Sequence, residues 1–542
     1  MKLLVIASSP ADYVEMADVA QVLAARAHEV WLVYLYSRSD DAGRVLDQLR
    51  ELTTRSGVHG VPIEVSEVPS QIPSGEVFEA VRGAPWIESS IVRDAMRSTM
   101  RWVRSRKLDL YPKNTFVGRW AYGSAHLVDV LRDRERTRET WRLFGRLYPR
   151  FRELTWGTWF AGVRTLHRAA AMVLHYRRFF DFIRNSITAF RLDALVIPED
   201  IVGSTWPVAI QAAHSCGIPA VVLPYTLANR AEAIQSLKGA APYQRRENEA
   251  AALLYPRWRY QSGAIDIVRL PSDHIMAHEE LGITPPDPWM MNSGSSDKIL
   301  VDSPASRDYF HDSGIPLEQL EVVGSVSQDR MFAVRQHRDS HLADLRAELG
   351  LSGRKPLLLL SGCPNQLTAS VPFCEFKSIE AVASFVGNSL APLGEHYHLV
   401  VRPHPGFPDF GRLLEPFGFA TSQRPTASLV PLADLFIAFA SATIRWAVAC
   451  AVPVVNYDVF HYGYDDFKRA RGVRTVSGSS DFSALVASLT PGAEALTEMK
   501  TAAQQDSAHW SVMDGRGIER IEEQIRRASE RRAAMKEQLQ HA

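Results

Sequence analysis

The chain has 542 residues, which at roughly 150 residues per domain predicts two to four domains. Apolar residues make up 46% and charged residues 23%, so the composition excludes a disordered chain, a collagen and a coiled-coil array. The 61 basic residues balance the 61 acidic ones, which is not the charge pattern of a protein that binds nucleic acid along its length. We therefore expect no nucleic-acid partner.

The amino terminus and the cysteines bear on the cellular compartment of the protein. The apolar run from Leu3 to Ala7 is too short for the core of a signal peptide and predicts a buried first strand instead. The four cysteines form no C-x-x-C pair, so the sequence predicts neither a disulfide framework nor a zinc site. These features favour a reducing, cytoplasmic location and a protein without a metal site.

Short runs rich in Val, Ile and Leu recur along the chain and alternate with helix-like patterning. Near-continuous apolar strands that alternate with helices are typical of parallel sheets covered on both faces. The sequence therefore predicts an α/β fold with two doubly wound, Rossmann-like domains that face a cleft. The predicted strands are Lys2–Ala7, Glu29–Tyr36, Ala194–Pro198, Ala220–Pro224, Lys298–Asp302, Leu320–Gly324, Pro356–Ser361, His398–Arg402, Leu435–Phe439 and Val452–Tyr457.

The strands fall into two groups, and a charged stretch separates them. We place the boundary near residue 346, which gives a first domain at 1–346 and a second domain at 347–517. Residues 518–542 are predicted to form a charged closing helix after the glycines at 515 and 517, which permit a sharp reversal of the chain.

A helical insertion is predicted at about residues 85–190, within the first domain. From 101 to 184 it carries 19 Lys and Arg against 7 Asp and Glu. Such a surface can lie on an anionic membrane or hold a phosphorylated acceptor. The alternative is a helical cap whose arginines are simply solvated.

The sequence Arg402-Pro403-His404-Pro405 follows an apolar strand of the second domain. Ligands of doubly wound sheets bind beyond the carboxyl ends of the strands, and the two prolines hold the imidazole on a stiff turn. His404 can donate to a phosphate oxygen of a leaving nucleotide, and Arg402 can add positive charge. The alternative is that His404 only ends a strand, with its ring bound to a backbone carbonyl.

A second polar group, Ser441-Ala442-Thr443, follows the strand that ends near Phe439 and opens a helix. Hydroxyls, backbone N–H groups and the helix dipole at such a point suit a phosphate, although an ordinary N-cap explains the same residues. Ser361 and Gly362 end another strand of the same sheet, where glycine permits close approach of a ligand. We expect these groups and His404 to converge on one anion.

Glu199 and Asp200 follow a strand of the first domain. Two adjacent carboxylates can supply a general base for an acceptor hydroxyl, since their repulsion raises one pKa. The alternative is that one of them caps the next helix. Asp12, after the first strand, is a weaker candidate for the base. Neither G-x-G-x-x-G after that strand nor a P-loop is present, which opposes redox and P-loop chemistry.

Together, Glu199-Asp200, His404-Pro405 and Ser441-Ala442-Thr443 resemble the motifs of GT-B glycosyltransferases of the bacterial sialyltransferase and Kdo-transferase type. The resemblance implies that an acidic residue activates the acceptor, that the histidine stabilises the departing CMP phosphate, and that the hydroxyl residues bind this phosphate. The sequence departs from the family pattern at Ile201, Trp446 and Ala451, which stand where a Gly, an acidic residue and a Gly are usual.

The resemblance implies transfer of a Kdo-like or sialic-like sugar from a CMP donor to a bacterial surface glycan or lipid-linked acceptor, without a redox cofactor or an obligatory metal. Within the enzyme class, the alternatives are a UDP-sugar transferase, a polyol-phosphate transferase and a sugar-nucleotide epimerase. The alternative from another class is a non-catalytic subunit that binds a glycan or a partner.

Overall fold

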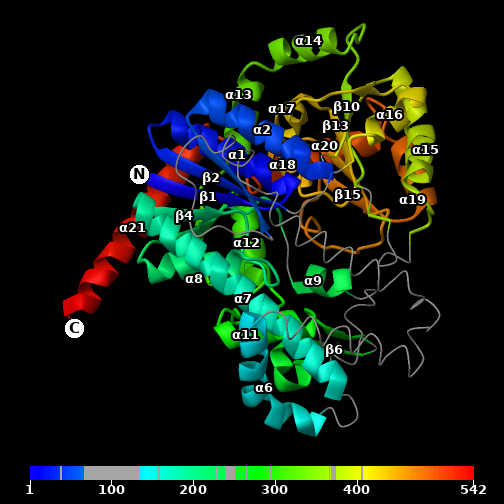
Figure 1. The fold of residues 1–542 in the computed structure, drawn as a ribbon. Coiled ribbons are helices and arrows are strands. Elements are labelled where there is room, and N and C mark those ends of the chain that lie inside the picture. The colour runs from blue at the N-terminus through cyan, green and yellow to red at the C-terminus, as the bar shows by residue number, and fades with distance from the viewer. Residues whose placement is uncertain are drawn as a thin grey trace.

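The computed structural model describes residues 1–36, 40–65, 134–154, 159–227, 230–237, 251–263, 265–292, 295–364, 366–367, 374–404 and 407–541. These residues form two parallel β-sheets with helices around them (Figure 1). The predicted α/β class, with two doubly wound parallel sheets, is confirmed.

The first sheet has seven strands, all paired in parallel. Along the first strand the buried side chains alternate between two cores: Leu4 and Ile6 contribute to one, Leu3 and Val5 to the other. Burial on both faces explains why this strand is apolar at nearly every position. The order is β3 (His59–Glu64), β2 (Glu29–Tyr36), β1 (Lys2–Ala7), β4 (Ala194–Ile197), β5 (Ala220–Val222), β8 (Lys298–Val301) and β9 (Leu320–Val322).

The second sheet has six parallel strands. Leu357 and Leu359 pack into the same core as Leu4 and Ile6 of the first sheet, so one apolar core is continuous between the sheets. Leu358 and Leu360 face a separate core. The order is β12 (Ala420–Thr421), β11 (His398–Arg402), β10 (Leu357–Ser361), β13 (Leu435–Ala438), β14 (Val454–Tyr457) and β15 (Val473–Val476).

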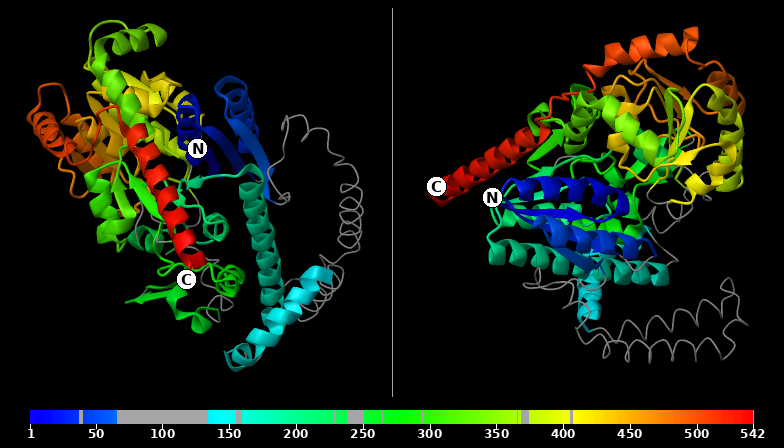
Figure 2. Two further views of the ribbon diagram at one scale, coloured as in Figure 1. Left: turned by 90° about the vertical axis from the view of Figure 1, so that its left-hand side faces the viewer. Right: turned by 90° about the horizontal axis from the view of Figure 1, so that it is seen from above.

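Helices connect the strands and cover both sheets (Figures 1 and 2). Around the first sheet lie α1 (Pro10–Ala25), α2 (Asp40–Ser56), α8 (Trp206–Ser215), α12 (Pro304–Asp312) and α13 (Val326–Gln336). Around the second lie α15 (Ile379–Leu390), α16 (Phe410–Leu414), α17 (Thr426–Leu429), α18 (Ile444–Ala449), α19 (Ser479–Ala487) and α20 (Glu494–Ser507). The predicted boundary near residue 346 lies in α14 (Arg338–Glu348), between the last strand of one sheet and the first strand of the other.

The described part of the helical insertion consists of α6 (Arg134–Leu154) and α7 (Trp159–Phe190), with α11 (Ser272–Leu281) packed against α7. The arginines of α6 and α7 form ion pairs, several of them with carboxylates of α11 outside the basic stretch. Glu280 binds Arg142 and Arg146, and Asp273 binds Arg168. Because carboxylates of α11 neutralise these arginines, the described part of the insertion favours the helical cap over a basic surface. The part of the predicted basic surface at 101–133 lies outside the described residues.

The last helix, α21 (Gly517–His541), returns to the first sheet and packs on α1 and α13 (Figure 2). Gly515 has φ +77°, which allows the reversal before the helix. Asp329 of α13 accepts the backbone N–H groups of Gly517 and Ile518 at 2.8 and 2.9 Å, so a carboxylate sits at the positive end of the helix. Within the described residues, no helix is long and apolar enough to cross a membrane.

Each of the ten predicted strands is present, and the structure adds strands that the sequence pattern does not predict. β3 contains Gly60 and Pro62, and proline is tolerated because β3 lies at the edge of its sheet. β15 is an edge strand with exposed positions, and β12 has only two residues. The connection at 229–297 holds an antiparallel hairpin, β6 (Arg259–Ser262) and β7 (Ile265–Val268), and a short helix, α9 (Arg230–Leu237).

Candidate functional site

The carboxyl ends of β10 and β11 lie side by side, with Ser361 in register with Arg402. The backbone N–H of Gly362 donates to the carbonyl of Arg402 at 2.7 Å. A Cβ atom at Gly362 would lie 2.5 Å from the backbone N of His404 and 2.7 Å from the Cα of Pro403. The glycine is therefore required because the backbone of the turn that carries His404 passes directly over it.

His404 is half-buried at this edge, and its carbonyl accepts the N–H of Phe407 at 2.9 Å. Burial, and next the charge of Arg402, lower the pKa of the imidazole. A lowered pKa favours the neutral imidazole at neutral pH. In that form the ring can bind a phosphate through its N–H group, as a hydrogen-bond donor without a positive charge. Pro405, the next residue of the predicted motif, lies outside the described residues.

Arg402 is anchored by backbone carbonyls. Its Nε donates to the carbonyl of Arg424 at 2.8 Å and its Nη1 to the carbonyl of Pro403 at 2.6 Å. Burial, and next the charge of Arg44 on α2, lower the pKa of the guanidinium. Arg402 therefore stiffens the turn and contributes positive charge to the edge, while two of its N–H groups are used by the protein itself.

The polar residues after β13 form a tight turn that leads directly into the predicted helix. The helix α18 begins at Ile444, and Thr443 occupies its N-cap position without a side-chain cap. The hydroxyls of Ser441 and Thr443 lie 2.8 Å apart, and the Ser441 hydroxyl accepts the N–H of Thr443 at 3.3 Å. The N–H groups of Ile444 and Arg445 donate to the carbonyls of Ser441 and Ala442, so this turn uses donors that were expected to face an anion.

Strand order determines how close these groups come. β10 lies between β11 and β13, so His404 and Ser441 follow strands that are separated by one strand. At a spacing of about 4.8 Å per strand, the two turns begin roughly 10 Å apart. Ser361 and Gly362 lie between them. A phosphate held by both turns therefore has to sit above Gly362.

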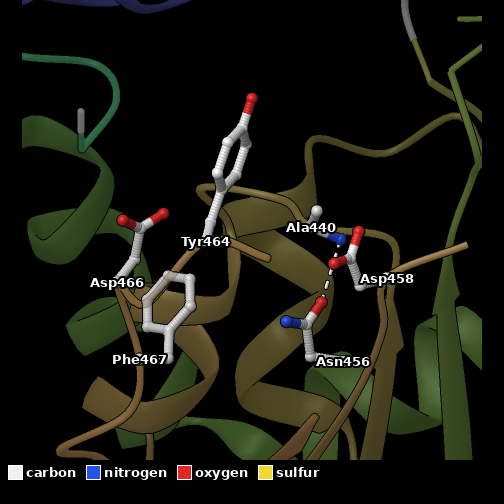
Figure 3. Close-up of a pocket in the computed structure, with 6 residues that line it drawn as sticks. All are labelled: Ala440, Asn456, Asp458, Tyr464, Asp466 and Phe467. Carbon is white, nitrogen blue, oxygen red and sulfur yellow. Dashed lines mark hydrogen bonds between the residues drawn. The ribbon is translucent and has the colours of Figure 1, made fainter. Parts of the chain in front are cut away.

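A small pocket lies at the same carboxyl edge of the second sheet, where the chain leaves β13 and β14 (Figure 3). Its shape depends on the N–H of Ala440, which donates to the side-chain oxygen of Asn456 at 2.9 Å, and on Asp458, whose carboxylate accepts two backbone N–H groups of the following turn. The lining residues are Ala440, Asn456, Asp458, Tyr464, Asp466 and Phe467.

The first sheet presents an acidic cluster at its own carboxyl edge. Glu199 follows β4 and is half-buried; burial, and next the charge of Asp12, raise its pKa to about 7. The indole N–H of Trp206 approaches this carboxyl and acts to lower the pKa, although it makes no hydrogen bond within the described residues. Asp12 itself is occupied, since it accepts the N–H groups of Ser8 and Ser9 in the capping box of α1.

Asp200 has a different environment from Glu199. It is fully buried, its N–H donates to the side chain of Asn292 at 2.6 Å, and its carboxylate accepts the N–H of Ser295 at 3.2 Å. Burial raises its pKa to about 6, and Glu199 is not among the causes. The charge of Asp200 is the last of the causes that act on the pKa of Glu199, so the expected repulsion raises one of the two pKa values but contributes less than burial and Asp12 do. Asp200 does not cap the next helix either, because the N-cap of α8 is Thr205.

The two edges meet through α18. Arg445 reaches into the first domain, where it donates to the carbonyl of Tyr225 at 2.8 Å and forms an ion pair with Asp302 at 3.2 Å that is not aligned as a hydrogen bond. Tyr225 follows β5; burial, and next the charges of Glu199 and Asp12, raise the pKa of its phenol. The acidic cluster therefore lies beside the contact between the first domain and the helix that follows Ser441.

Among the described residues, no group of three His, Cys, Asp or Glu side chains is arranged to hold a metal ion. The residues that sequence reasoning missed are Tyr225, Glu232, Tyr309, Arg445 and Asp466. Arg445 stands out in the sequence as a cation within an apolar stretch, and a buried cation calls for a buried partner. The Tyr309 hydroxyl on α12 contacts Glu232 on α9 and Asp466 after β14, and no local pattern predicts this contact because the three residues are far apart in the sequence.

No family model matches the sequence, and no curated protein matches it. Similar solved structures include a UDP-GlcNAc 2-epimerase from Neisseria meningitidis bound to UDP-GlcNAc, with TM-score 0.44 and 10% identity over 96% of this chain and 99% of that chain. The glycotransferase of kitacinnamycin has TM-score 0.42 and 13% identity over 96% and 98%. A glycosyltransferase from Rickettsia africae has TM-score 0.41 and 9% identity over 97% and 98%. At these scores the similarity carries no argument about function.

Proposed function

We propose that the protein is a glycosyltransferase that moves a sugar from a nucleotide donor to a glycan or lipid-linked acceptor. One observation carries the proposal: Glu199, with a pKa raised to about 7, lies beside the contact between the first domain and α18, which follows the Ser441 turn of the second sheet. A carboxylate with that pKa is half ionised near neutral pH, which suits a general base.

In the proposed step, Glu199 takes the proton of the acceptor hydroxyl. At the same time, the oxygen of that hydroxyl forms a bond to the anomeric carbon of the donor sugar. The bond from that carbon to the phosphate oxygen breaks, and its electron pair leaves with the phosphate. His404 donates a hydrogen bond to the departing phosphate, and the charge of Arg402 stabilises the anion as it develops.

The donor is proposed from the resemblance in the sequence. It favours a CMP-linked acidic sugar, with a UDP-sugar or a polyol-phosphate donor as the alternatives. Thermal-shift measurements with CMP, CDP, UDP and GDP separate them, since a bound ligand raises the melting temperature. Stabilisation by CMP supports the leading donor, whereas stabilisation by UDP and not by CMP rejects it. If none of the four nucleotides raises the melting temperature, the proposal of a transferase is wrong.

His404→Ala tests the phosphate contact directly. Loss of a hydrogen bond to a charged group costs about 1.5–3 kcal/mol, so the Kd of the stabilising nucleotide should rise about tenfold to 150-fold in calorimetric titrations. His396, an exposed histidine just before β11, provides the matched control, and His396→Ala should bind as the wild type does. Equal Kd values for His404→Ala and the control would remove His404 from the site.

An epimerase and a non-catalytic binding subunit are the remaining candidates. Incubation of the nucleotide sugar without an acceptor distinguishes them, since an epimerase converts the sugar in the absence of any acceptor. A binding subunit leaves the nucleotide sugar intact under every condition and still binds it.

A further inference from the structure

Glu232, Tyr309 and Asp466 meet where the first domain contacts the segment that follows β14. Glu232 lies on α9, Tyr309 on α12, and Asp466 on the connection between β14 and β15. The phenolic oxygen of Tyr309 lies 2.9 Å from Glu232 Oε1 and 2.5 Å from Asp466 Oδ1. All three side chains have restricted access to water, so two acidic groups and a phenol share a partly desolvated site.

A count of hydrogens shows what this contact requires. A phenol has one O–H group, which can donate to one carboxylate oxygen. If both carboxyl groups were ionised, the second short contact would bring two acceptors together, and two negative charges would lie side by side in a partly desolvated place. The three groups therefore hold together when one of the carboxyls carries a proton.

We propose that Glu232, Tyr309 and Asp466 form a proton-dependent latch that fastens the segment at 458–471 to the first domain. This segment supplies Asp458, Tyr464 and Asp466 to the pocket beyond β14, as Figure 3 shows. Loss of the shared proton weakens the latch and frees the segment. The pocket thus takes its observed shape in the protonated state, whatever ligand the site accepts.

The cations that the structure describes near the latch have other partners. On the same segment Asp465 lies close by and pairs with Lys468. Burial, and next the charge of Glu232, raise the pKa of the Tyr464 phenol, and Asp466 contributes as well. On α9, Arg230 is directed to Asp287 at 3.8 Å. Arg469 pairs with Asp312 at the end of α12. Burial, and then the neighbouring Asp466, raise the pKa of Glu232 far above its usual range, and burial raises the pKa of Asp466 as well.

Limited proteolysis with trypsin tests the latch without any substrate. Lys468, Arg469 and Arg471 lie exposed on the segment, and cleavage tracks the population of the open form when opening is fast. In Glu232→Gln the amide supplies the missing hydrogen at every pH. Between about pH 6 and pH 9, cleavage of the wild type relative to this variant should rise by about tenfold per pH unit, since the latched form binds a proton that the open form releases.

Glu498→Gln on α20 is the matched control, because it removes an exposed charge that contributes to the pKa shift of neither latch carboxyl. Its ratio to the wild type should stay constant with pH. In Asp466→Asn the amide at position 466 supplies the hydrogen, so this variant should behave as Glu232→Gln does. It keeps the test available if Glu232→Gln fails to fold. A constant ratio of wild type to both amide variants across this pH range would overturn the latch, and it would leave the proposal of a transferase unaffected.

Discussion

The role proposed for Glu199 as a general base carries a cost in stability. Its carboxyl is half-buried beside Asp12, and both the burial and that charge favour the protonated form. The folded protein therefore binds a proton more tightly at this position than the unfolded chain does. The stability that this group contributes falls as the pH rises from about 4.5 towards the folded pKa of about 7.

Glu199→Gln separates these two effects. We expect the rate of sugar transfer to fall about 10²-fold to 10⁴-fold, because the amide cannot take the proton from the hydroxyl of the acceptor. At pH values above 7 the free energy of unfolding should rise by about 1–3 kcal/mol, since an ionised buried carboxylate is removed. The wild-type rate should increase with pH through about 7 as the base ionises. Rate assays and chemical denaturation across that range measure both.

Asp200→Asn is the companion variant. Because Asp200 is buried with a raised pKa, and the Asn oxygen can still accept the N–H of Ser295, the change should not lower stability above about pH 6 and should leave the pH dependence of the rate in place. If Asp200→Asn abolished transfer and Glu199→Gln did not, the base would be Asp200.

The backbone at Ala451 adopts a left-handed conformation. It has φ +58° directly after α18, a conformation that favours glycine, and it is the position at which the family resemblance has a Gly. Ala451→Gly should raise the free energy of unfolding by about 1 kcal/mol, since a left-handed non-glycine residue is strained by that amount. Urea denaturation measures the change, and an unchanged or lower midpoint would show that the backbone here is not strained.

At the scale of elements, the paired ends of β10 and β11 build the proposed phosphate site. In Gly362→Ala the new Cβ would meet the backbone of Pro403 and His404, which cannot move aside as a flexible side chain can. We expect a loss of about 1–3 kcal/mol in stability together with weaker nucleotide binding. A Cβ atom added at Gly43 on α2 would have no neighbour within 4 Å, so Gly43→Ala should be neutral or stabilising. Equal nucleotide affinity in both variants would argue against the site.

The elements also show what sequence reasoning can reach. The apolar runs predict strands such as β1 and β11 with their observed bounds, because burial on both faces makes them almost wholly apolar. β3 escapes prediction because its Pro62 obscures a strand signal. Gly362 and His404 are recognisable as residues at strand ends, and the structure brings them together. The distance between the His404 and Ser441 turns depends on strand order, which a single sequence does not reveal.

At the scale of the whole molecule, one buried ion pair joins the two domains. Arg445 and Asp302 are each 5% exposed and follow strands of different sheets. Arg445→Ala leaves the Asp302 carboxylate buried without its partner, so the free energy of unfolding should fall by about 3–5 kcal/mol. Removing both charges in Arg445→Met with Asp302→Asn should restore much of that loss. Thermal and chemical denaturation of the three proteins measure it; a double variant as unstable as the single one would contradict the pairing.

A crystal structure of the protein with the nucleotide that raises its melting temperature most would decide whether the two carboxyl edges form a transferase site. We predict that a phosphate oxygen lies within hydrogen-bond distance of the His404 imidazole, above Gly362, with the donor sugar directed towards Glu199. A nucleotide bound away from the carboxyl edge of the second sheet, or with its phosphate out of reach of His404, would contradict the proposed function.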